Sequence, residues 1–390
     1  MIINKKMKKI IYRLHQLTVI FNLYFFKIIF FFCQKDCKDY FLISERGNDA
    51  RDNGYYFYNF LKKNHPECKV KYIITKDSPD IKKIAKDDII YYNSPQHYKY
   101  LLYSKYLIST HIMGYTPNTS ISMKLNKLNL LPTAGKKIFL QHGITKDYTK
   151  LFDYSYTKLS LFICAAKKEY DFIKEFNKYP PNKICDIGFC RFDSLDPTAL
   201  IPNTILIMPT WRHWHSNYSD KQFKTSNFFK EYDALLNSDE LISFIEQNNI
   251  KIYFYLHHET QRFSHLFKPN CQNIVICQKS DFDVQDLLNK CQMLITDYSS
   301  VFFDFAYMKK KIIYFHFDYY KYRQTHHEGY FSYENDGFGK IFYNSKDIID
   351  DLKKYGMGMN SFFKNRVDLF FGKNDNNNCK RTFDEIVHLE

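Results

Sequence analysis

The stretch LITDYSSVFFDFAYMKKKIIYF, residues 294–315, decides how the rest of the chain is interpreted. It begins with two apolar residues and is then interrupted by the polar segment TDYSS (296–300). An apolar run with helical spacing follows, and a second β-prone run ends the stretch. This order predicts a buried strand, a helix over 299–309 and a second buried strand. The acid and the two serines therefore fall at a junction between strand and helix.

The same alternation of short strands and helices extends over most of the 390 residues. The predicted strands are 40–44, 70–74, 89–92, 106–109, 137–140, 161–164, 204–208, 252–256, 274–276, 293–296 and 312–315. The predicted helices, besides 299–309, are 55–63, 79–85, 96–104, 228–247, 283–290, 347–355 and 359–371. This pattern favours α/β domains with parallel sheets that are covered on both faces.

A polar, proline-containing segment, DSLDPTALIPNT (193–204), predicts a domain boundary, and the chain length suits about two domains. We therefore predict two doubly wound, Rossmann-like domains that face a cleft. The predicted divisions are an N-terminal segment (1–36), a first Rossmann-like domain (37–195), a second one (196–358) and a helical tail (359–390).

The N-terminal segment places five basic residues before an apolar run from Leu17 to Phe32. That run is shorter than the roughly 20 residues that cross a bilayer, and no small-residue cleavage site of a signal peptide follows it. The preferred interpretation is a basic, aromatic-rich helix that lies in the membrane interface. A transmembrane anchor and a buried first helix stay open as alternatives. The expected location is peripheral, on the cytoplasmic face of the membrane.

The overall charge is strongly basic, with 56 Lys and Arg against 42 Asp and Glu and a formal charge of +14. This balance favours an anionic partner such as nucleic acid, a membrane surface or a phosphate-rich substrate. No nucleic-acid-binding module is recognisable, so we expect no nucleic-acid partner. The ten cysteines are scattered and form no paired zinc motif, which indicates free thiols in a reducing compartment.

Polar residues directly follow five of the predicted strands. Parallel strands place their carboxyl ends at one edge of a sheet, which is where doubly wound folds bind ligands. Five such positions in one chain predict a functional site at these edges. In chain order they are Ser44-Glu45-Arg46-Gly47, Gln141-His142-Gly143, Pro209-Thr210-Trp211-Arg212, His257-His258-Glu259 and Thr296-Asp297-Tyr298-Ser299-Ser300.

Each of these side chains has a chemical and a structural interpretation. A neutral His142 can take a proton from an attacking hydroxyl, and Arg212 can bind phosphate as a bidentate donor. Ser299 and Ser300 fall where a helix N-terminus receives phosphates. Asp297 is expected to cap that helix or to hold a neighbouring Arg, His or hydroxyl. The structural alternatives are a hydrogen-bonded histidine, a surface ion pair and a plain helix cap.

Taken together, six segments resemble the CDP-glycerol glycerophosphotransferase family, whose members make teichoic acids and related polyol-phosphate capsule polymers. The resemblance runs from about residue 40 to about residue 345. It implies a GT-B fold and transfer of a polyol phosphate from a CDP-polyol to a polymer or lipid-linked hydroxyl, with release of CMP. The segments are SERGNDARDNGYYFYNFL (44–61), QHGITKDY (141–148), GFCRFDSL (188–195), PTWR (209–212), LHHE (256–259) and the opening stretch.

The resemblance also implies roles for particular residues. His142 corresponds to the family's proposed base, and His257 to a second histidine that assists the phosphate or the leaving group. The residues expected to bind the donor diphosphate are Thr210, Arg212, Asp297, Ser299 and Ser300, and those expected on the acceptor side are Glu45, Arg46 and Gly143.

The identity of the transferred unit stays open among glycerol, ribitol and another phosphate-linked unit. Gln141 stands where the family often has Trp, and His258 stands where it often has Pro. A glycosyltransferase of the same fold that uses a nucleotide sugar is the alternative function. The sequence requires no cofactor and no metal held by the protein. For Mg²⁺, Asp297 is the single acidic residue that suggests a ligand.

Overall fold

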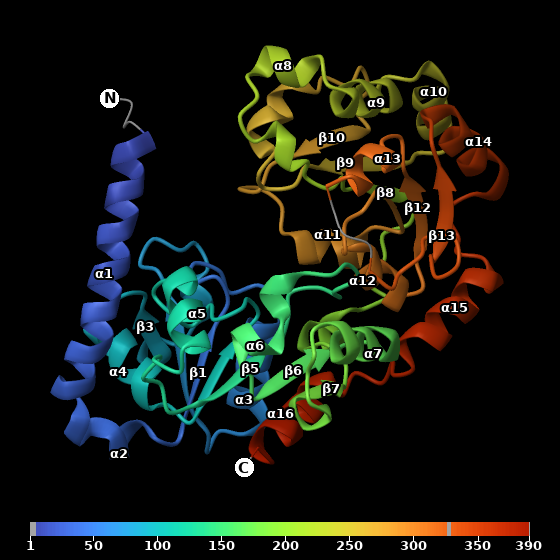
Figure 1. Ribbon diagram of the computed structural model, residues 1–390. Helices are drawn as coiled ribbons and strands as arrows, with labels where there is room; N and C mark the ends of the chain where they lie inside the picture. Colours follow the sequence, from blue (N-terminus) through green and yellow to red (C-terminus); the bar gives the residue numbers. More distant parts are fainter. Residues whose placement is uncertain (1–4, 326–328, 390) are drawn as a thin grey trace. The chain divides into compact units, whose positions relative to one another are not determined.

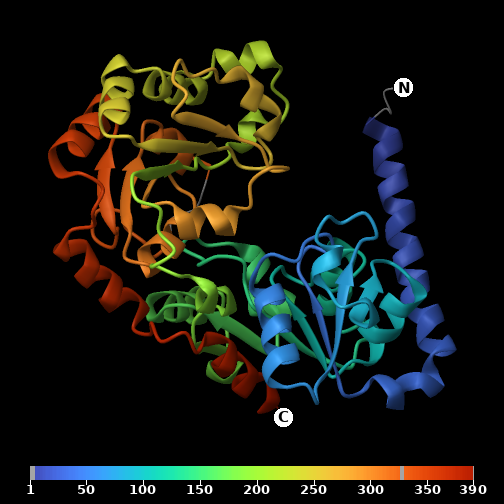
Figure 2. The ribbon, with the colours of Figure 1, turned by 180° about the vertical axis from the view of Figure 1, so that it is seen from behind.

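The computed structural model describes residues 5–325 and 329–389. The chain forms two units, and each has its own parallel sheet (Figures 1 and 2). Unit 1 comprises Met1–Ile144, Thr149–Ser194 and Asp375–Glu390, and unit 2 comprises Thr145–Tyr148 and Leu195–Asn374. The main division at Ser194–Leu195 lies one residue from the predicted boundary, whereas the predicted C-terminal tail is shared between the two units.

Unit 1 contains seven parallel strands in the order β3-β2-β1-β4-β5-β6-β7. Their core residues, such as Leu42, Ile43, Leu107 and Ile108, are completely buried, as expected for strands covered on both faces. The strand order reverses between β1 and β4. The strands are β1 Tyr40–Ser44, β2 Lys69–Ile74, β3 Ile89–Tyr91, β4 Tyr106–Ser109, β5 Lys136–Phe139, β6 Leu161–Cys164 and β7 Ile184–Asp186.

The helices of unit 1 cover its sheet and extend to both ends of the chain (Figure 1). Several begin with a side-chain cap, since Ser94 accepts a hydrogen bond from the His97 amide and Asn118 accepts one from the Ile121 amide. The helices are α1 Lys5–Ile29, α2 Gln34–Cys37, α3 Asn53–Asn64, α4 Pro95–Tyr103, α5 Thr119–Lys127, α6 Tyr154–Thr157, α7 Lys167–Phe176 and α16 Asn378–Val387.

Unit 2 contains six parallel strands in the order β10-β9-β8-β11-β12-β13, with the reversal between β8 and β11. The strands are β8 Thr204–Ile207, β9 Lys251–Tyr255, β10 Ile274–Cys277, β11 Met293–Thr296, β12 Lys311–Phe315 and β13 Gly339–Phe342. The helices are α8 Asp220–Lys224, α9 Asn227–Leu236, α10 Asp239–Gln247, α11 Val284–Lys290, α12 Phe302–Tyr307, α13 Tyr319–Arg323, α14 Ser345–Tyr355 and α15 Ser361–Phe371. The prediction of an α/β chain with two parallel sheets is confirmed.

Three predicted helices differ from the structure. Residues 79–85 form no α-helix and contribute only one short 3₁₀ turn, Ile81–Lys83, while the Asp80 carboxylate binds the Ala50 amide and the Arg51 side chain. The predicted helix 228–247 is two helices, and Ser238 caps the second. The predicted helix 299–309 is reduced to α12, because Ser299 and Ser300 lie in the turn before it and Lys309 adopts a left-handed φ of 55°.

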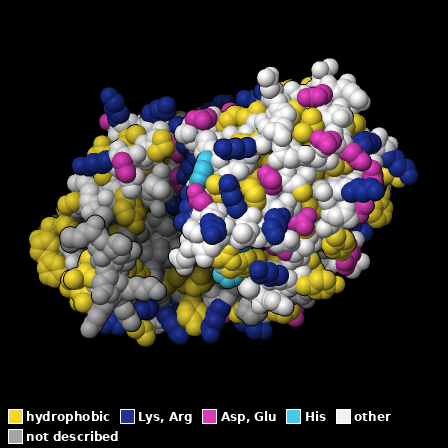
Figure 3. Space-filling model, turned by 90° about the horizontal axis from the view of Figure 1, so that it is seen from above, with side chains coloured by type: hydrophobic (Ala, Val, Ile, Leu, Met, Phe, Trp, Pro, Cys, Tyr) yellow, Lys and Arg dark blue, Asp and Glu magenta, His cyan; other side chains and the backbone are white. Residues whose placement is uncertain are grey.

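Helix α1 is apolar on two opposite faces. One face packs beside α4, where Val19 and Leu23 are buried and the Phe26 ring stacks on Tyr98 with centroids 5.1 Å apart. The other face is exposed. In Figure 3, hydrophobic side chains gather at the left edge of the molecule, on the side where α1 lies. No single helix in the described ranges is long and apolar enough to cross a membrane. A pair bent by 69°, Ile10–Ile29 with Phe31–Cys37, meets that requirement by length and composition.

Candidate active site at the carboxyl ends of the strands

In unit 1, the candidate residues gather where the strand order reverses. Ser44 of β1 and Ser109 of β4 are paired in register, so the segments that follow them emerge side by side. The Ser109 hydroxyl donates to the Glu45 carbonyl oxygen at 3.2 Å. A Cβ atom at Gly114 would lie 2.2 Å from that same oxygen, so the close approach of these loops requires glycine there.

The turn that presents His142 depends on Gln141. Gln141, and not Gly143, adopts the left-handed conformation, with a φ of 58°. Its side-chain amide donates to the Ile163 carbonyl at 2.7 Å and to the Glu169 carboxylate at 3.0 Å, and its own carbonyl accepts from Asn53. These bonds hold a strained backbone next to the candidate base, while Gly143 is buried directly after it.

The His142 ring is exposed, and one of its faces rests on the ring of His111. The two ring centroids are 4.6 Å apart and the planes are tilted by only 11°. The Thr110 carbonyl lies next to the same ring and favours a proton on it. The surrounding protein lowers the pKa of His142, and Arg46 and Arg191 lower it further, while Asp52 opposes them. A neutral imidazole carries one N–H group and one unprotonated nitrogen, and the unprotonated nitrogen is the acceptor that a base needs.

Arg191 supports the backbone of this histidine. Its Nη1 atom donates to the His142 carbonyl at 3.1 Å and binds the Asp52 carboxylate at 3.0 Å. The Arg191 side chain is almost entirely buried, so it holds the His142 backbone from the interior of unit 1. Arg191 lies within the GFCRFDSL segment, although the sequence alone singled out no role for it.

Glu45 and Arg46 have different surroundings. The buried Glu45 carboxylate accepts from the Arg51, Asp52 and Tyr55 amides at 2.8–3.0 Å, which are donors at the start of α3. Burial and the neighbouring Asp52 raise the pKa of Glu45 to about 7 against the effect of these amides. The exposed Arg46 donates through Nε to His111 Nε2 at 2.9 Å. Glu45 therefore stabilises α3, and Arg46 lies beside the histidine pair.

In unit 2, a buried charge cluster joins the ends of β8 and β11. The Thr210 amide donates to Asp297 at 2.7 Å, and Arg212 Nη2 binds the same carboxylate at 2.8 Å. Arg212 also makes a two-point contact with Asp318, at 2.8 and 2.9 Å, and is completely buried. The two carboxylates raise the pKa of Arg212 against the effect of burial. Asp297 thus holds a neighbouring arginine, which is one of its two expected roles.

These contacts determine which side chains of unit 2 can still bind a phosphate. The Arg212 guanidinium is enclosed by carboxylates and the Thr210 carbonyl, so its direct phosphate contact stays a prediction. Ser299 and Ser300 are half-buried in the turn that follows β11. The Thr210 hydroxyl is buried and has no hydrogen-bond partner among the described residues. These three hydroxyls are candidate donors at the carboxyl edge of the sheet.

His257 follows β9, the strand next to β8. Its Nδ1 atom accepts from the Glu259 amide at 3.3 Å, so the neutral ring carries its proton on Nε2. The half-buried ring lies nearly parallel to Trp211, with centroids 6.1 Å apart, and the His258 ring lies against it at 4.1 Å. The structure therefore brings the PTWR and LHHE segments together, with His257 as a potential hydrogen-bond donor.

Comparison with known proteins decides the family. The sequence profile of the family described as CDP-Glycerol:Poly(glycerophosphate) glycerophosphotransferase matches residues 24–388. The chain belongs to this glycerophosphotransferase family. It is 32% identical over 378 residues to the minor teichoic acid biosynthesis protein GgaB of Bacillus subtilis, covering 90% of this chain and 40% of that protein. It is 21% identical to a teichoic acid poly(glycerol phosphate) polymerase of Staphylococcus epidermidis, covering 88% and 49%. The chain thus spans two-fifths to a half of these relatives.

Solved structures show the same fold. The wall teichoic acid polymerase TagF matches with a TM-score of 0.70 at 17% identity, over 91% of this chain and 90% of that chain. A UDP complex of MnaA from Staphylococcus aureus matches with a TM-score of 0.55 at 10% identity, over 90% and 96%. At these identities the likeness concerns architecture. Within the glycerophosphotransferase family, the site described above is therefore interpreted from this chain's own residues.

Besides Arg191, two further residues of the candidate site were not predicted. His111 follows β4 and Asp318 follows β12, so both obey the strand-end rule that identified the other candidates. Strand 106–109 and strand 312–315 were predicted, and the polar residues after them could have been found by the same reasoning. His111 contacts His142, and Asp318 contacts Arg212.

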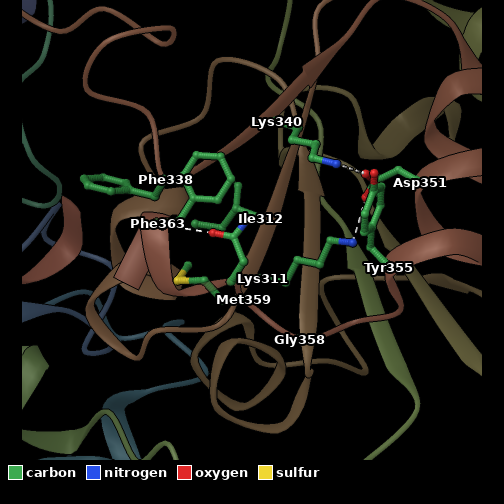
Figure 4. Close-up of a pocket in the computed structure, with 10 residues that line it drawn as sticks. Lys311, Ile312, Phe338, Lys340, Asp351, Tyr355, Gly358, Met359 and Phe363 are labelled. Carbon is green, nitrogen blue, oxygen red and sulfur yellow. Dashed lines mark hydrogen bonds and ion pairs between the residues drawn. The ribbon is translucent and has the colours of Figure 1, made fainter. Parts of the chain in front are cut away.

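A cavity at the opposite edge of the unit 2 sheet is a weaker candidate (Figure 4). It has a volume of about 380 Å³ and lies beside Lys311 and Lys340, at the amino ends of β12 and β13. Both lysines bind the Asp351 carboxylate, at 2.7 and 2.6 Å, and Lys340 lies 3.7 Å from the centre of the Tyr355 ring. Because the charges of this cavity are paired internally, we place the candidate site at the carboxyl edges. The described residues contain no group of three or more His, Cys, Asp or Glu arranged for a metal ion.

Proposed function

We propose that this protein transfers glycerol phosphate from CDP-glycerol to a hydroxyl of a growing surface polymer or lipid-linked acceptor, and releases CMP. The polymer would be a teichoic acid or a related capsule polymer. Family membership and the teichoic acid relatives support the donor and the reaction class. The observation that carries the proposal is the exposed His142 ring, which follows β5 at the carboxyl edge of the unit 1 sheet and stacks on His111 at the end of the neighbouring strand β4.

In the proposed reaction, the acceptor oxygen attacks the β-phosphorus of CDP-glycerol. The bond from that phosphorus to the oxygen of CMP breaks, and CMP leaves with the bond electrons. His142 accepts the proton of the attacking hydroxyl, which contributes roughly 10²–10⁴-fold to the rate. His257 donates a hydrogen bond to the phosphate oxygens or to the leaving group. The hydroxyls of Thr210, Ser299 and Ser300 add donors that stabilise the charge.

The donor and acceptor sides are assigned to different units in this proposal. Unit 2 binds the CDP portion through the residues after β8 and β11, and the buried Arg212–Asp297 pair fixes the shape of that edge. Unit 1 presents the base and the acceptor. We propose a GT-B arrangement in which the two carboxyl edges face one cleft, since both sheets have the strand order that binds ligands at its reversal point.

We further propose a peripheral location on the cytoplasmic face of the membrane. The exposed face of α1 supports it, because Ile10, Leu14, Leu17, Phe21 and Ile28 recur at intervals of three, four and seven residues and are all exposed. Such an apolar stripe next to a basic N-terminus suits an anionic bilayer surface. The acceptor polymer or its lipid carrier would then be presented at the same surface.

The deciding experiment measures CMP release by the purified protein. CDP-glycerol, CDP-ribitol and a UDP- or CMP-sugar are offered in turn with an oligomeric glycerol phosphate acceptor. We expect CMP from CDP-glycerol and loss of this release in His142→Ala. His65→Ala is the matched control, because His65 belongs to the same unit but stacks on Phe383 away from the site. Product release from the nucleotide sugar alone would overturn the reaction and favour a glycosyltransferase.

A further inference from the structure

We infer that Arg46 binds a phosphate of the acceptor beside the attacking hydroxyl, and that His111 is the positioning residue that holds Arg46 next to the base. This inference rests on the proposed function, because that function makes His142 the base. It goes further by naming the side chain that recognises the acceptor's phosphate and the residue that positions that side chain. The acceptor must carry an anionic phosphate close to the hydroxyl that reacts.

The hydrogen bonds around His111 fix its tautomer. A guanidinium can only donate, so the contact of 2.9 Å from Arg46 Nε makes His111 Nε2 an acceptor. The ring proton then resides on Nδ1 and is donated to the Thr110 hydroxyl at 3.0 Å. The His111 amide is also anchored, since it donates to the Ser109 hydroxyl at 3.1 Å. His111 is therefore a neutral ring with every polar atom engaged.

This fixed ring links Arg46 to the base. His111 lies flat against His142, and Thr110 contacts both rings, one through its hydroxyl and the other through its carbonyl. Burial, with the neighbouring His142 and Arg46, lowers the pKa of His111 to about 2. Both ring nitrogens of His111 are engaged by Arg46 and Thr110, so His142 is the member of the pair that can accept a proton. Arg46, His111 and His142 form one connected group.

The outer edge of Arg46 is available to a ligand. Within residues 5–325 and 329–389, its Nη1 and Nη2 atoms have no hydrogen bond or ion pair, and the side chain is exposed. The neighbouring carboxylates are engaged elsewhere, because Glu45 binds the amides of α3 and Asp52 binds Arg191. Two parallel N–H groups in a planar fork match the two oxygens of a phosphate.

The location of this fork selects the ligand. A phosphate bound there lies on the acceptor side, in the same loop cluster as the base and in unit 1. An acceptor that ends in a glycerol phosphate carries its phosphodiester a few bonds from the terminal hydroxyl. Arg46 would therefore favour acceptors that already end in a phosphate-linked unit over neutral acceptors of the same length.

The test compares two soluble acceptors with the full chain and CDP-glycerol. One acceptor ends in glycerol phosphate, and the other has an uncharged methylphosphonate at the last linkage. For Arg46→Ala we expect KM for the charged acceptor to rise about 10- to 100-fold, since charge-assisted hydrogen bonds are worth about 1.5–3 kcal/mol. KM for the uncharged acceptor should stay within about twofold. Lys63→Ala removes an exposed charge from α3 of the same unit and is the matched control.

A second variant tests the positioning role. His111→Phe keeps an aromatic ring against His142 but removes the acceptor of the Arg46 bond. We expect its KM for the charged acceptor to rise while kcat stays close to that of the wild type. His111→Ala should lower kcat as well, because it also removes the stacked ring. A merely structural role would lower the folded fraction and leave the ratio of the two KM values unchanged.

Two results would overturn the inference. One is an Arg46→Ala protein that discriminates between the two acceptors as the wild type does. The other is a His111→Phe protein with an unaltered KM for the charged acceptor. If the wild type releases no CMP from CDP-glycerol, the proposed function fails separately. Calorimetric titration with the glycerol phosphate oligomer then still tests Arg46, because acceptor binding needs no turnover.

Discussion

At the scale of single residues, the protonation of His142 sets the working pH of the proposed reaction. A base must be neutral, and the surroundings of His142 lower its pKa below the ordinary value of about 6.5. Activity should therefore be flat from pH 7.5 down to about 6.5 and fall only at lower pH, by about tenfold per pH unit. The measurement is kcat/KM for the acceptor against pH. If the loss of activity had its midpoint above pH 6.5, the assignment of His142 as the base would be contradicted. Any activity that remains in His142→Gln should not fall at low pH in this way.

Arg212 provides the second prediction at this scale. Removing it leaves Asp297 and Asp318 buried without their cation, so Arg212→Ala should lower the free energy of unfolding by about 3–5 kcal/mol. Urea unfolding measures this change. Arg262→Ala is the control, because Arg262 donates to the loop carbonyls of His215, Ser216 and Tyr218 and binds no carboxylate among the described residues, so its removal should cost much less. If Arg212→Ala were fully stable but inactive, Arg212 would instead contact phosphate directly.

At the scale of elements, the exposed face of α1 predicts membrane binding. Leu17, Phe21 and Ile28 are 62%, 64% and 75% exposed and lie on one face. A fully buried side chain of this size contributes about 1.5–3 kcal/mol, so replacing all three with Ser should weaken partitioning by at least 100-fold. Cosedimentation with anionic phosphatidylglycerol vesicles measures this. Leu369→Ser, which is 86% exposed on α15, is the control. Unchanged cosedimentation would exclude α1 as the anchor.

The strands were predictable because most of them are buried on both faces and form short apolar runs. Eleven of the predicted runs are strands in the structure, whereas β7 and β13 were missed. Only three residues form β7, and β13 begins with Gly339 and Lys340, so neither shows an apolar run. Helix 299–309 was predicted too long because its apolar spacing continues through residues that form turns. Periodicity records which side chains are buried and does not record where the helical hydrogen bonds begin.

The candidate site was predictable in its positions but not in its pairings. The strand-end rule located Thr210, Arg212 and Asp297, but it could not show that β8 and β11 are neighbours. Arg212 was expected to bind a phosphate, which stays a prediction, and the structure adds its contact with Asp318, which is 106 residues further along the chain. Such a partner depends on the strand order, and only the folded sheet determines that order. The same limit explains why the contact between His111 and His142 was not foreseen.

At the scale of the whole molecule, the last helix returns to the first unit and depends on a cap from elsewhere in the chain. Asp193 accepts from the amides of Asn378 and Cys379, at 2.9 and 2.8 Å, where α16 begins. A Cβ atom at Gly188, whose φ is +88°, would meet the Asn378 side chain at 1.8 Å, so this helix end approaches the backbone closely. Unit 1 therefore contains residues from both the first and the last part of the sequence.

Asp193→Ala should destabilise α16 on unit 1 without altering unit 2. Loss of a helix cap costs about 0.5–2 kcal/mol, so we expect faster amide exchange over α16 and a slightly lower unfolding temperature. Hydrogen exchange read by mass spectrometry measures both units in one sample. Asp171→Ala, which removes only an exposed ion pair with Lys167, is the control and should change stability by less than about 0.5 kcal/mol. If exchange rose equally over α15 of unit 2, Asp193 would stabilise more than the helix it caps. If α16 exchanged at the wild-type rate, its packing on α3 would be sufficient without the cap.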